Sequence, residues 1–555
     1  MIARLSALTS ILVWILTFAA PARPQAVRDV RLSVEEAIAV ALERNLGLAA
    51  DRFTPLLAYD QSRADWGQFD PTLSLGYSYT EHDIPESPGQ RFRISQAVSF
   101  GLEQRDMTGD FSTGLSGLLT PGTRYGVFWD TNRYDTNYFS YFPDSSVEQY
   151  NSSLRLELSQ PFLKNRGRLI NTLRIQQAER AAQESFYAWS ERVADVALAA
   201  ERAYWELVYA ERNVAIAGLS LEVAKDLLRN IEAGYRVEMR AKVEVLEAEA
   251  QVELRRELLL TARNQRDDAE DALKRLLNWF EGDYLDFVRL VPSSSPEMPL
   301  RPLDVEKSFA TARARRGVLW AAREAITQAS LEQLFARNQL LPDLSLASWI
   351  SYTGLAPEGK DSIPNLGGLP SFPDRDVSDA WDLMSSGEYY DWSIGLFFTY
   401  PLGNRTARVR RDMADKQRAQ AEILLADAEQ QVLLDVRSRI RQIMTDRQRI
   451  ESASTAVVLE AERLRISRKS HELGLITSHD VMEVLDDYSS ALVRELRAQI
   501  DARISFAQLL RVEGTYLAVH NVTLESPFPE LPLTGSGEFR APGPLGPGWI
   551  FPRKN

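Results

Sequence analysis

Chemically reactive side chains are scarce in this chain. Its 555 residues include no cysteine and only four histidines, which are mostly far apart: His82, His471, His479 and His520. A thiolate zinc site, a cysteine nucleophile and a disulfide framework are therefore excluded, and a histidine-based metal or catalytic centre is not expected. Acidic residues are abundant, but none has the neighbours that nucleophilic or metal catalysis needs. We therefore predict a protein that is not an enzyme and that uses no metal and no other cofactor.

Two pairs of carboxylates stand out by their spacing. Asp480 and Glu483 are three residues apart, as are Glu244 and Glu247, and residues three apart lie on one face of an α-helix. Carboxylates clustered in a pore concentrate cations and repel anions. The alternative is structural, because an acidic residue in the first turn of a helix stabilises the helix dipole. Both interpretations require a helix at each pair.

The overall charge argues against a nucleic-acid partner. The chain has 64 Lys+Arg and 77 Asp+Glu, so 64 − 77 gives a net charge of −13. Proteins that bind nucleic acid usually present a basic surface to the phosphates. We therefore expect no nucleic-acid partner.

The N-terminus indicates export. Arg4 precedes an apolar run over residues 5–20, and Ala20-Pro21-Ala22 fits a small-x-small cleavage site. Residues 1–22 are therefore predicted to be a signal peptide, with a short membrane anchor as the alternative. No later stretch approaches the roughly 18 apolar residues of a spanning helix. If the mature protein enters a membrane, we expect a closed β-barrel.

The chain repeats itself in order. The matching segments are 33–41 with 304–312, 68–75 with 339–346, and 244–247 with 480–483. The last pair has a smaller offset than the first two, so the first half carries roughly 35 additional residues, an estimate that rests on comparing long internal repeats. We predict a tandem duplication with a first repeat at 23–291, a Pro/Ser-rich linker at 292–302 and a second repeat at 303–524.

Alternating residues predict β-strands in both halves. Apolar and polar residues alternate over 73–79, 154–159 and 392–400, which a barrel with one lipid-facing and one water-facing surface requires. A soluble β-sandwich gives the same alternation. Aromatic residues crowd the same regions and favour a membrane interface. Runs at 111–119 and 125–129 flank Pro121-Gly122 and predict an additional hairpin.

Long helices follow the strands. Helical segments are predicted at 33–67, 169–235, 241–278, 304–341, 405–472 and 478–512. Ser33 and Glu36 form a capping-box sequence for the first of them. The segment 169–235 spans roughly 100 Å at 1.5 Å per residue, and apolar residues from Leu207 to Tyr235 recur at alternating steps of three and four, as in a coiled coil. A dimeric coiled coil or a filament is the alternative.

These features together resemble the TolC family of outer-membrane efflux proteins. Ser-Gln-Pro-Phe-Leu at 159–163 resembles the family's strand-to-helix junction, Ala-Tyr-Trp-Glu-Leu at 203–207 its first long helix, and residues 474–483 its hairpin tip. The resemblance covers about residues 30–520. It implies an α+β membrane protein whose tandem-duplicated protomer combines β-barrel strands with very long α-helical coiled-coil hairpins. Three such chains would form one barrel and a periplasmic helical tunnel, with four strands from each chain in the typical member.

The resemblance also implies a role for the tip residues. In the family, a carboxylate pair past the second hairpin tip narrows the periplasmic entrance, and Asp480 and Glu483 match that pair. Glu244 and Glu247 are the first-repeat counterparts, expected to be less central. The family glycine before the first tip is replaced by Glu238, so that turn is expected to differ.

Three basic residues lie close to the first tip. Arg236, Arg240 and Lys242 either pair with the acidic residues and hold the entrance shut, or are solvated surface charges. The sequence favours neither interpretation.

The resemblance further implies location and partners. We expect a homotrimer in the lipid of the outer membrane, with helices extending into the periplasm, and two partners: a periplasmic adaptor and an inner-membrane transporter. The chain would be the passive exit duct of a tripartite efflux pump or a type I secretion system. A non-channel structural coiled-coil protein of the periplasm or cell surface is the alternative. The Pro/Gly-rich tail, 525–555, is predicted to be extended or disordered.

Overall fold

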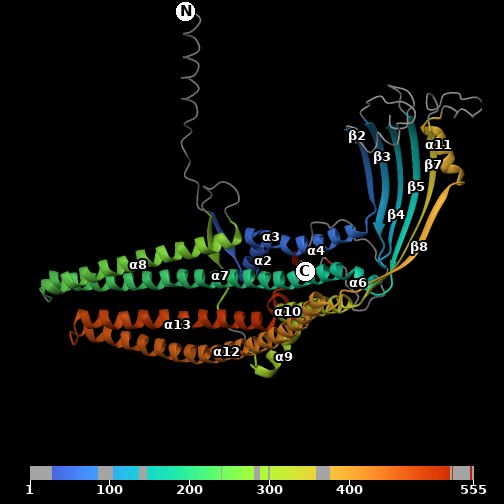
Figure 1. Cartoon of the computed structure of the whole chain (residues 1–555). Helices are drawn as coiled ribbons and strands as arrows, with labels where there is room; N and C mark the ends of the chain where they lie inside the picture. The colour runs from blue at the N-terminus through green and yellow to red at the C-terminus, as the bar shows by residue number, and fades with distance from the viewer. Residues whose placement is uncertain are drawn as a thin grey trace, which may run out of the picture.

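The protein is an elongated α+β molecule. The computed structural model describes residues 28–84, 104–136, 147–238, 240–279, 288–297, 301–357, 375–524, 528 and 550–552. The predicted signal peptide, 1–22, lies outside these ranges, as does most of the tail. Figure 1 shows a curved β-sheet at one end and two long helical hairpins that extend side by side away from it.

One antiparallel sheet contains six strands in the order β2-β3-β4-β5-β7-β8. Their bounds are β2 Thr72–Ile84, β3 Gln104–Leu118, β4 Arg124–Thr136, β5 Val147–Pro161, β7 Asp343–Pro357 and β8 Tyr390–Thr399. The strands predicted at 73–79, 154–159 and 392–400 are confirmed. The additional hairpin is also confirmed: β3 and β4 pair with each other and join the sheet between β2 and β5.

The strand register places apolar residues on a single face. Val127 pairs with Leu156, Leu156 with Ile350, and Ile350 with Trp392, and paired residues in a sheet point to the same side. Leu156 and Trp392 are exposed on this side. The neighbouring positions, such as Ser393, point to the other side, because side chains alternate along a strand. The sheet therefore has an exposed apolar face and a more polar one.

A short helix, α11 (Val377–Ser386), lies on the apolar face near one end of the strands (Figure 1). The Trp381 ring packs edge-on against Trp129 of β4 at 4.4 Å between centroids. At Gly354 of β7, a Cβ atom would lie 1.9 Å from the carbonyl oxygen of Ala380. Only glycine therefore permits this close approach of helix and strand.

The two hairpins are formed by four helices: α7 Leu173–Arg236, α8 Lys242–Leu277, α12 Arg405–Glu472 and α13 Ser478–Glu513. With 64 residues, α7 is about 96 Å long, and α12, with 68 residues, about 102 Å. The predicted long helices are confirmed, including the bounds 405–472. Of the predicted α7 seam, Leu207, Ala210, Leu221, Ala224 and Ile231 are buried, whereas Tyr235 is exposed.

The remaining elements are shorter. They are β1 Arg28–Leu32, α2 Val34–Arg44, α3 Leu46–Asp51, α4 Phe53–Asp65, η1 Trp66–Phe69, α6 Arg168–Asn171, β6 Val288–Pro292, α9 Val305–Arg315, α10 Gly317–Asn338, α14 Tyr516–Val519, β9 Val522–Leu524 and β10 Ile550–Pro552. The parallel pair β1–β6 brings the start of the first half next to the segment that leads into the second half. The predicted division into two repeats and a linker stays a prediction.

Two predicted helices are interrupted. The segment predicted at 33–67 divides into α2, α3, α4 and η1, and the segment at 304–341 into α9 and α10. Asn45 causes the first break, because its side chain caps α3 by accepting from the Leu48 N–H and also donates to the Leu276 carbonyl. The capping box of Ser33 and Glu36 is present as predicted.

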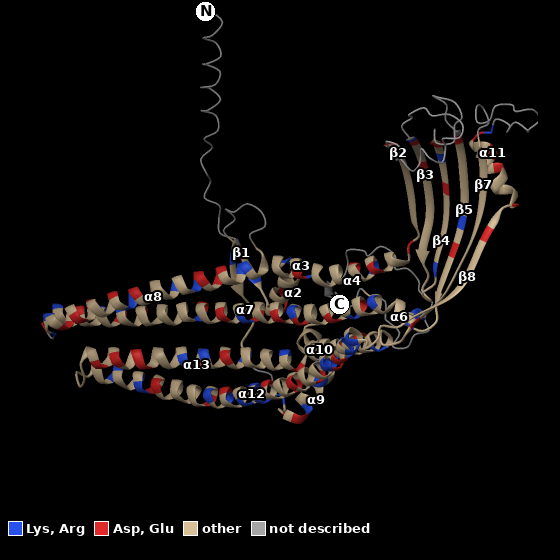
Figure 2. Cartoon of the chain, viewed as in Figure 1, with Lys and Arg blue, Asp and Glu red and all other residues tan. Residues whose placement is uncertain are grey.

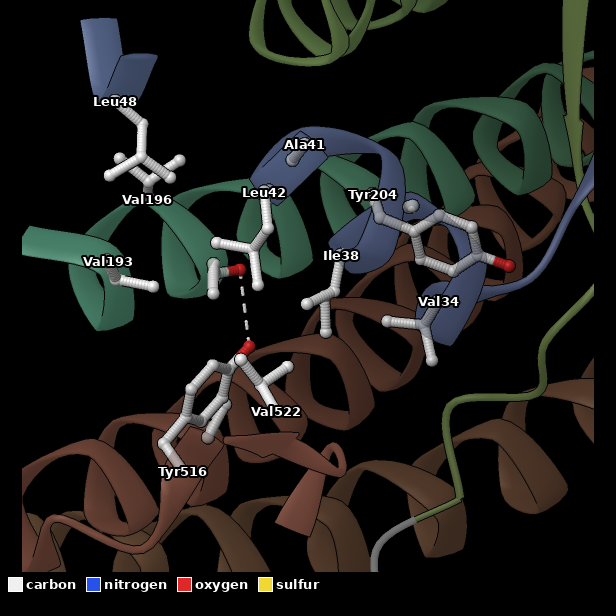
Figure 3. Close-up of a cluster of buried hydrophobic side chains, with 14 of the residues drawn as sticks. Val34, Ile38, Ala41, Leu42, Leu48, Val193, Val196, Tyr204, Tyr516 and Val522 are labelled. Atoms are coloured by element: carbon white, nitrogen blue, oxygen red, sulfur yellow. Dashed lines mark hydrogen bonds between the residues drawn. The ribbon is translucent and has the colours of Figure 1, made fainter. Parts of the chain in front are cut away.

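The main core lies where α2, α7, α13 and α14 meet (Figure 3). Ile38 of α2 and Tyr204 and Trp205 of α7 are almost completely buried there. The Tyr516 hydroxyl lies 2.7 Å from the buried carboxylate of Glu201 and 3.2 Å from the Ala197 carbonyl. Phe528, from the region predicted to lack structure, is buried 4.9 Å from the Tyr59 ring.

Ion pairs join the two hairpins. Arg255 of α8, whose side chain is 2% exposed, lies 2.6 Å from Asp486 of α13. Arg497 of α13 donates two hydrogen bonds to Glu206 of α7, at 2.8 and 3.1 Å. Because a buried charge is costly without a partner, the buried Arg255 favours the alignment of the hairpins that places Asp486 beside it.

Candidate functional site at the hairpin tips

Both hairpins turn at the same end of the molecule, away from the sheet (Figure 1). The first turn connects Arg236, the end of α7, to Lys242, the start of α8. The second connects Glu472 to Ser478. Charged residues occur along the helices and at both turns, whereas the strands are mostly uncharged (Figure 2).

The second turn is closed by backbone and side-chain hydrogen bonds. Gly474 has a left-handed backbone, with φ of +72°, and its N–H donates to the His471 carbonyl at 3.0 Å. His471 is buried, and its Nδ1 lies 3.2 Å from the Ile476 carbonyl oxygen. These contacts position Thr477 to begin α13.

Asp480 is part of a capping box. Its carboxylate accepts from the Thr477 N–H at 2.8 Å and from the Thr477 hydroxyl at 2.7 Å, while the Asp480 N–H donates back to that hydroxyl. The hydrogen bonds from Thr477, first from its side chain and then from its backbone, lower the pKa of Asp480. In the protomer, Asp480 therefore has the structural role of an acid at a helix start.

Glu483 follows one turn later on the same helix face and is exposed. It forms no hydrogen bond or ion pair with any residue that the structure describes. Val481, Met482, Val484 and Leu485, on the other sides of α13, are buried. The two predicted acids therefore share the exposed face of α13, and Glu483 carries the charge without a partner.

The first turn has a left-handed residue at the position equivalent to Gly474. Glu238 has φ of +58°, and its N–H donates to the Tyr235 carbonyl at 3.0 Å. The difference expected from the replacement of glycine is therefore absent at this residue, whereas for the turn as a whole it stays a prediction. Glu238 adopts a left-handed conformation that costs a side-chain-bearing residue roughly 1–2 kcal/mol.

Arg240 links the two turns. Its guanidinium lies 3.1 Å from the Glu244 carboxylate and donates to the His471 carbonyl of the other hairpin at 3.4 Å. Arg240 and Glu244 are each about one quarter exposed. Of the three predicted basic residues, Arg240 is thus paired with a predicted acid, but with Glu244 and not with Asp480 or Glu483.

The other two basic residues face solvent. Arg236 is 78% exposed and lies 3.7 Å from Glu232, one turn earlier on α7. Lys242 is exposed and pairs with no residue in the described part of the chain. The structure therefore supports the solvated interpretation for Arg236 and Lys242 within one protomer.

Glu247 belongs to a different surface. It lines a cleft of about 200 Å³ between α8 and α13, together with Gln251, Ser478, His479 and Met482. Asp480 and Glu483 do not line this cleft. The two acidic pairs of the sequence therefore occupy unequal environments, because Glu244 is paired and Glu247 faces the neighbouring hairpin.

An apolar cluster holds the tips together. It includes Ile231 of α7, Val252 of α8, Leu464 of α12 and Val481 and Leu485 of α13. Beside it, a groove of about 480 Å³ lies between α7, α12 and α13 and contains Arg465, Arg468, Lys469 and Tyr488 among apolar side chains. This groove was not predicted, although the basic residues of α12 were a visible signal in the sequence.

The described residues contain no group of three or more His, Asp or Glu side chains arranged to hold a metal ion. In the same part of the chain, no helix is long and apolar enough to cross a membrane.

Comparison with known proteins finds relatives that share this architecture. The family model described as outer membrane efflux protein matches residues 126–278 and 309–515. The crystal structure of the CmeC outer membrane channel of Campylobacter jejuni is 16% identical, with a TM-score of 0.59 over 87% of this chain and 86% of that one.

Two other solved structures are comparable. VceC, an outer membrane protein of Vibrio cholerae, is 16% identical, with a TM-score of 0.57 over 87% and 96% of the two chains. The open state of the MtrE outer membrane channel of Neisseria gonorrhoeae is 17% identical, with a TM-score of 0.56 over 87% and 89%. At these identities the likeness concerns the fold alone. No curated protein matched the sequence.

Proposed function

The chain belongs to the outer membrane efflux protein family, and we propose that it is the outer-membrane exit duct of a tripartite efflux pump. Its location is the cell outer membrane, with the helices in the periplasm. The family's members are transport ducts and not enzymes. The duct proposed here is passive and receives its cargo from an energised transporter in the inner membrane.

The observation that carries the proposal is the exposed apolar face of the sheet. Leu75 of β2 and Ile394 and Leu396 of β8 are each at least 60% exposed. A soluble protein rarely leaves so many large apolar side chains in water, and extended patches of this kind mark contacts with protein or lipid. Alternation of apolar and polar residues is what a sheet between lipid and a water-filled lumen requires.

The helices supply a second argument, for a trimer. α8 and α12 lie on the outer sides of the paired hairpins (Figure 1), and both expose apolar side chains. They are Leu254, Leu258 and Leu260 of α8 and Ile423, Leu424, Val458 and Leu459 of α12. Neighbouring copies would bury these stripes against each other and complete a tunnel from the three pairs of hairpins. We take the copy number of three from the family.

The proposed partners follow from the position of the tips. A passive duct whose tips end in the periplasm needs a periplasmic adaptor and an inner-membrane transporter. The same duct also suits a type I secretion system, in which the transporter delivers a polypeptide.

The acidic residues have a proposed role at the tips. In a trimer, Asp480 and Glu483 would form two rings of carboxylates at the entrance, which concentrate cations there. The contact of Arg240 with Glu244 and the His471 carbonyl would help to hold the two hairpins together in a closed entrance.

The assembly can be tested directly. Analytical ultracentrifugation of the purified protein in detergent should give a trimer, and fractionated cells should contain it in the outer membrane. A folded, stable monomer, or a soluble periplasmic protein, would instead favour the alternative, a structural coiled-coil protein that forms no channel.

A further inference from the structure

The hairpin β3–β4 is part of the sheet wall. β3 pairs with β2 over residues 104–116, and β4 pairs with β5 over its whole length. Phe111 and Leu115 of β3 and Val127 of β4 are exposed on the apolar face, continuous with Leu156 of β5. If the hairpin were instead folded into the lumen of a barrel or across its opening, its apolar residues would not continue the apolar face of the sheet. In the described part of each chain, six strands therefore form this sheet.

The sheet has two edges, β2 and β8. Among the described residues, neither strand pairs with another strand on its outer side. In lipid, unpaired backbone N–H and C=O groups cost several kcal/mol each, so these edges must meet a strand from another copy. The chain direction alternates along the sheet, so β8 of one copy can pair antiparallel with β2 of the next.

The internal repeat fixes how these edges meet. β2 of the first half corresponds to β7 of the second, with an offset of 271 residues, because Pro71 matches Pro342. β5 corresponds to β8 with an offset of 240, because Pro161 matches Pro401. Each proline is followed by an asparagine with a left-handed backbone, Asn165 four residues on and Asn404 three residues on, with φ of +60° and +39°, so the offset applies to the strands and changes by one residue in the turn.

The contact between β5 and β7 joins the last strand that the first half adds to the sheet to the first strand that the second half adds. The contact between β8 and the next copy's β2 is the same kind of junction. In the first, Leu156 pairs with Ile350, Glu157 with Trp349 and Leu158 with Ser348. Applying the two offsets, 156 + 240 gives Leu396 and 350 − 271 gives Tyr79.

We propose that three copies close an eighteen-stranded barrel through β8–β2 junctions in which Leu396 lies opposite Tyr79 of the next copy. This inference rests on the proposed function for the copy number, and three times six strands gives eighteen. The same register places Phe397 opposite Ser78 and Phe398 opposite Tyr77. It keeps the apolar residues Leu396, Phe398, Tyr77 and Tyr79 on one continuous face.

The strand count determines the width of the membrane pore. Barrel diameter grows roughly in proportion to strand number, and barrels of 16–18 strands leave an aqueous channel. Eighteen strands would give a diameter about one and a half times that of the twelve that four per chain would supply. The insert adds no long helix, so the tunnel keeps four per chain.

Disulfide formation between copies tests the register, because the natural chain has no cysteine. Two double variants carry the in-register pairs: Leu396→Cys with Tyr79→Cys, and Phe397→Cys with Ser78→Cys. Antiparallel pairs alternate between Cα separations of about 4.5 and 5.5 Å, so one of the two pairs has the closer spacing. A matched control, Leu396→Cys with Tyr77→Cys, is slipped by two residues on the same face.

On mild oxidation in native membranes, at least one in-register pair should give species of two and three linked chains on a denaturing gel. The slipped control should give at least tenfold less. Electron cryomicroscopy of the unmodified protein should show eighteen strands. A conducting trimer with twelve wall strands, or linkage only in the slipped control, would overturn this inference and leave the proposed function intact. A protein that stays monomeric and carries no current would overturn the proposed function itself.

Discussion

Glu238 and Gly474 occupy the same position in the two hairpin turns and share its left-handed backbone, with φ of +58° and +72°. Both follow their helix by two residues, and the internal offset of 236 that relates Glu244 to Asp480 also relates these two. The second turn has glycine, which tolerates this conformation, whereas the first turn has a residue with a side chain, Glu238. The first tip is therefore strained relative to the second.

Exchanging the residues should reverse this difference. Glu238→Gly removes the energetic cost of a left-handed backbone at a residue with a side chain, but it also raises the conformational entropy of the unfolded chain. We therefore expect the variant to stabilise the first turn by about 0.5–1 kcal/mol. Gly474→Glu should destabilise the second turn by about 1 kcal/mol. Amide hydrogen exchange at the two turns measures both, because each 1.4 kcal/mol changes protection tenfold when exchange reports opening. Faster exchange in Glu238→Gly would contradict the assignment of strain.

The acidic face of α13 should determine ion selectivity. Replacing Asp480 by Asn and Glu483 by Gln removes up to six negative charges from a trimer, so cation preference should fall and block by multivalent cations should weaken. Reversal potentials under a salt gradient, with and without a trivalent cation, measure both effects.

The matched control is the change of Glu244 and Glu247 to Gln. It should have the smaller effect, because Glu244 is paired with Arg240 and Glu247 faces the cleft between the hairpins. If ion selectivity and block are unchanged in the Asp480/Glu483 variant, these residues do not act on ions. Their role is then limited to stabilising the start of α13, as in the capping box of Asp480.

The two faces of β8 should respond differently to a new charge. Ile394 lies on the apolar face and is 60% exposed, whereas Ser393 pairs with Trp349 on the opposite face. Ile394→Arg should cost roughly 2–4 kcal/mol if the site is near the bilayer midplane and reduce the yield of assembled protein in the outer membrane. Ser393→Arg should assemble normally. Equal yields of assembled protein would mean that the lipid-facing side is wrongly assigned.

His520 should make the periplasmic core sensitive to acid. Burial lowers its pKa, and this effect outweighs the carboxylates of Glu201 and Glu35; Arg503 lowers the pKa further. The His520 Nε2 lies 3.7 Å from Glu201, and the Tyr516 ring packs beside it. The unfolded chain therefore binds a proton more readily than the folded protein does.

The expected sign follows from this difference. The neutral, buried histidine contributes fully above the unfolded pKa of about 6.5, and stability is lost as the pH falls from there towards the lower folded pKa. His520→Gln should remove that part of the dependence. Thermal unfolding followed by circular dichroism between pH 7.5 and 5 compares the two proteins. A steeper loss of stability in the variant would contradict the direction of the pKa shift.

Long local patterns made much of the fold predictable. The bounds of α12 follow from a proline-free run with a clear start after Pro401 and an end before Gly474, and the β3–β4 hairpin follows from alternation around Pro121-Gly122. The break at Asn45 was not predictable, since it depends on a hydrogen bond to Leu276, 231 residues away. α11 was also missed, although the chain shows local signals for it: Asp376 and Asp379 form a capping box at its start and Gly387 ends it with a left-handed backbone.

The site was predictable in part for the same reason. Capping by Asp480 depends on its distance in sequence from Thr477, which any reader of the chain can see. The position of Arg240 between Glu244 and the His471 carbonyl depends on how the two hairpins pack, and only the folded structure supplies that. The fold of one chain is enough to place Asp480 and Glu483 on the same face of α13. Whether these residues surround an entrance depends on the proposed trimer.

Single-channel recording tests the central claim most directly. The purified protein should be incorporated into a planar lipid bilayer, and the current across it measured at fixed voltage in symmetrical salt. We predict discrete, uniform conductance steps that are cation-selective and require the trimeric fraction. A folded, trimeric protein that inserts into the bilayer and carries no current would contradict the proposal that this chain forms an export duct.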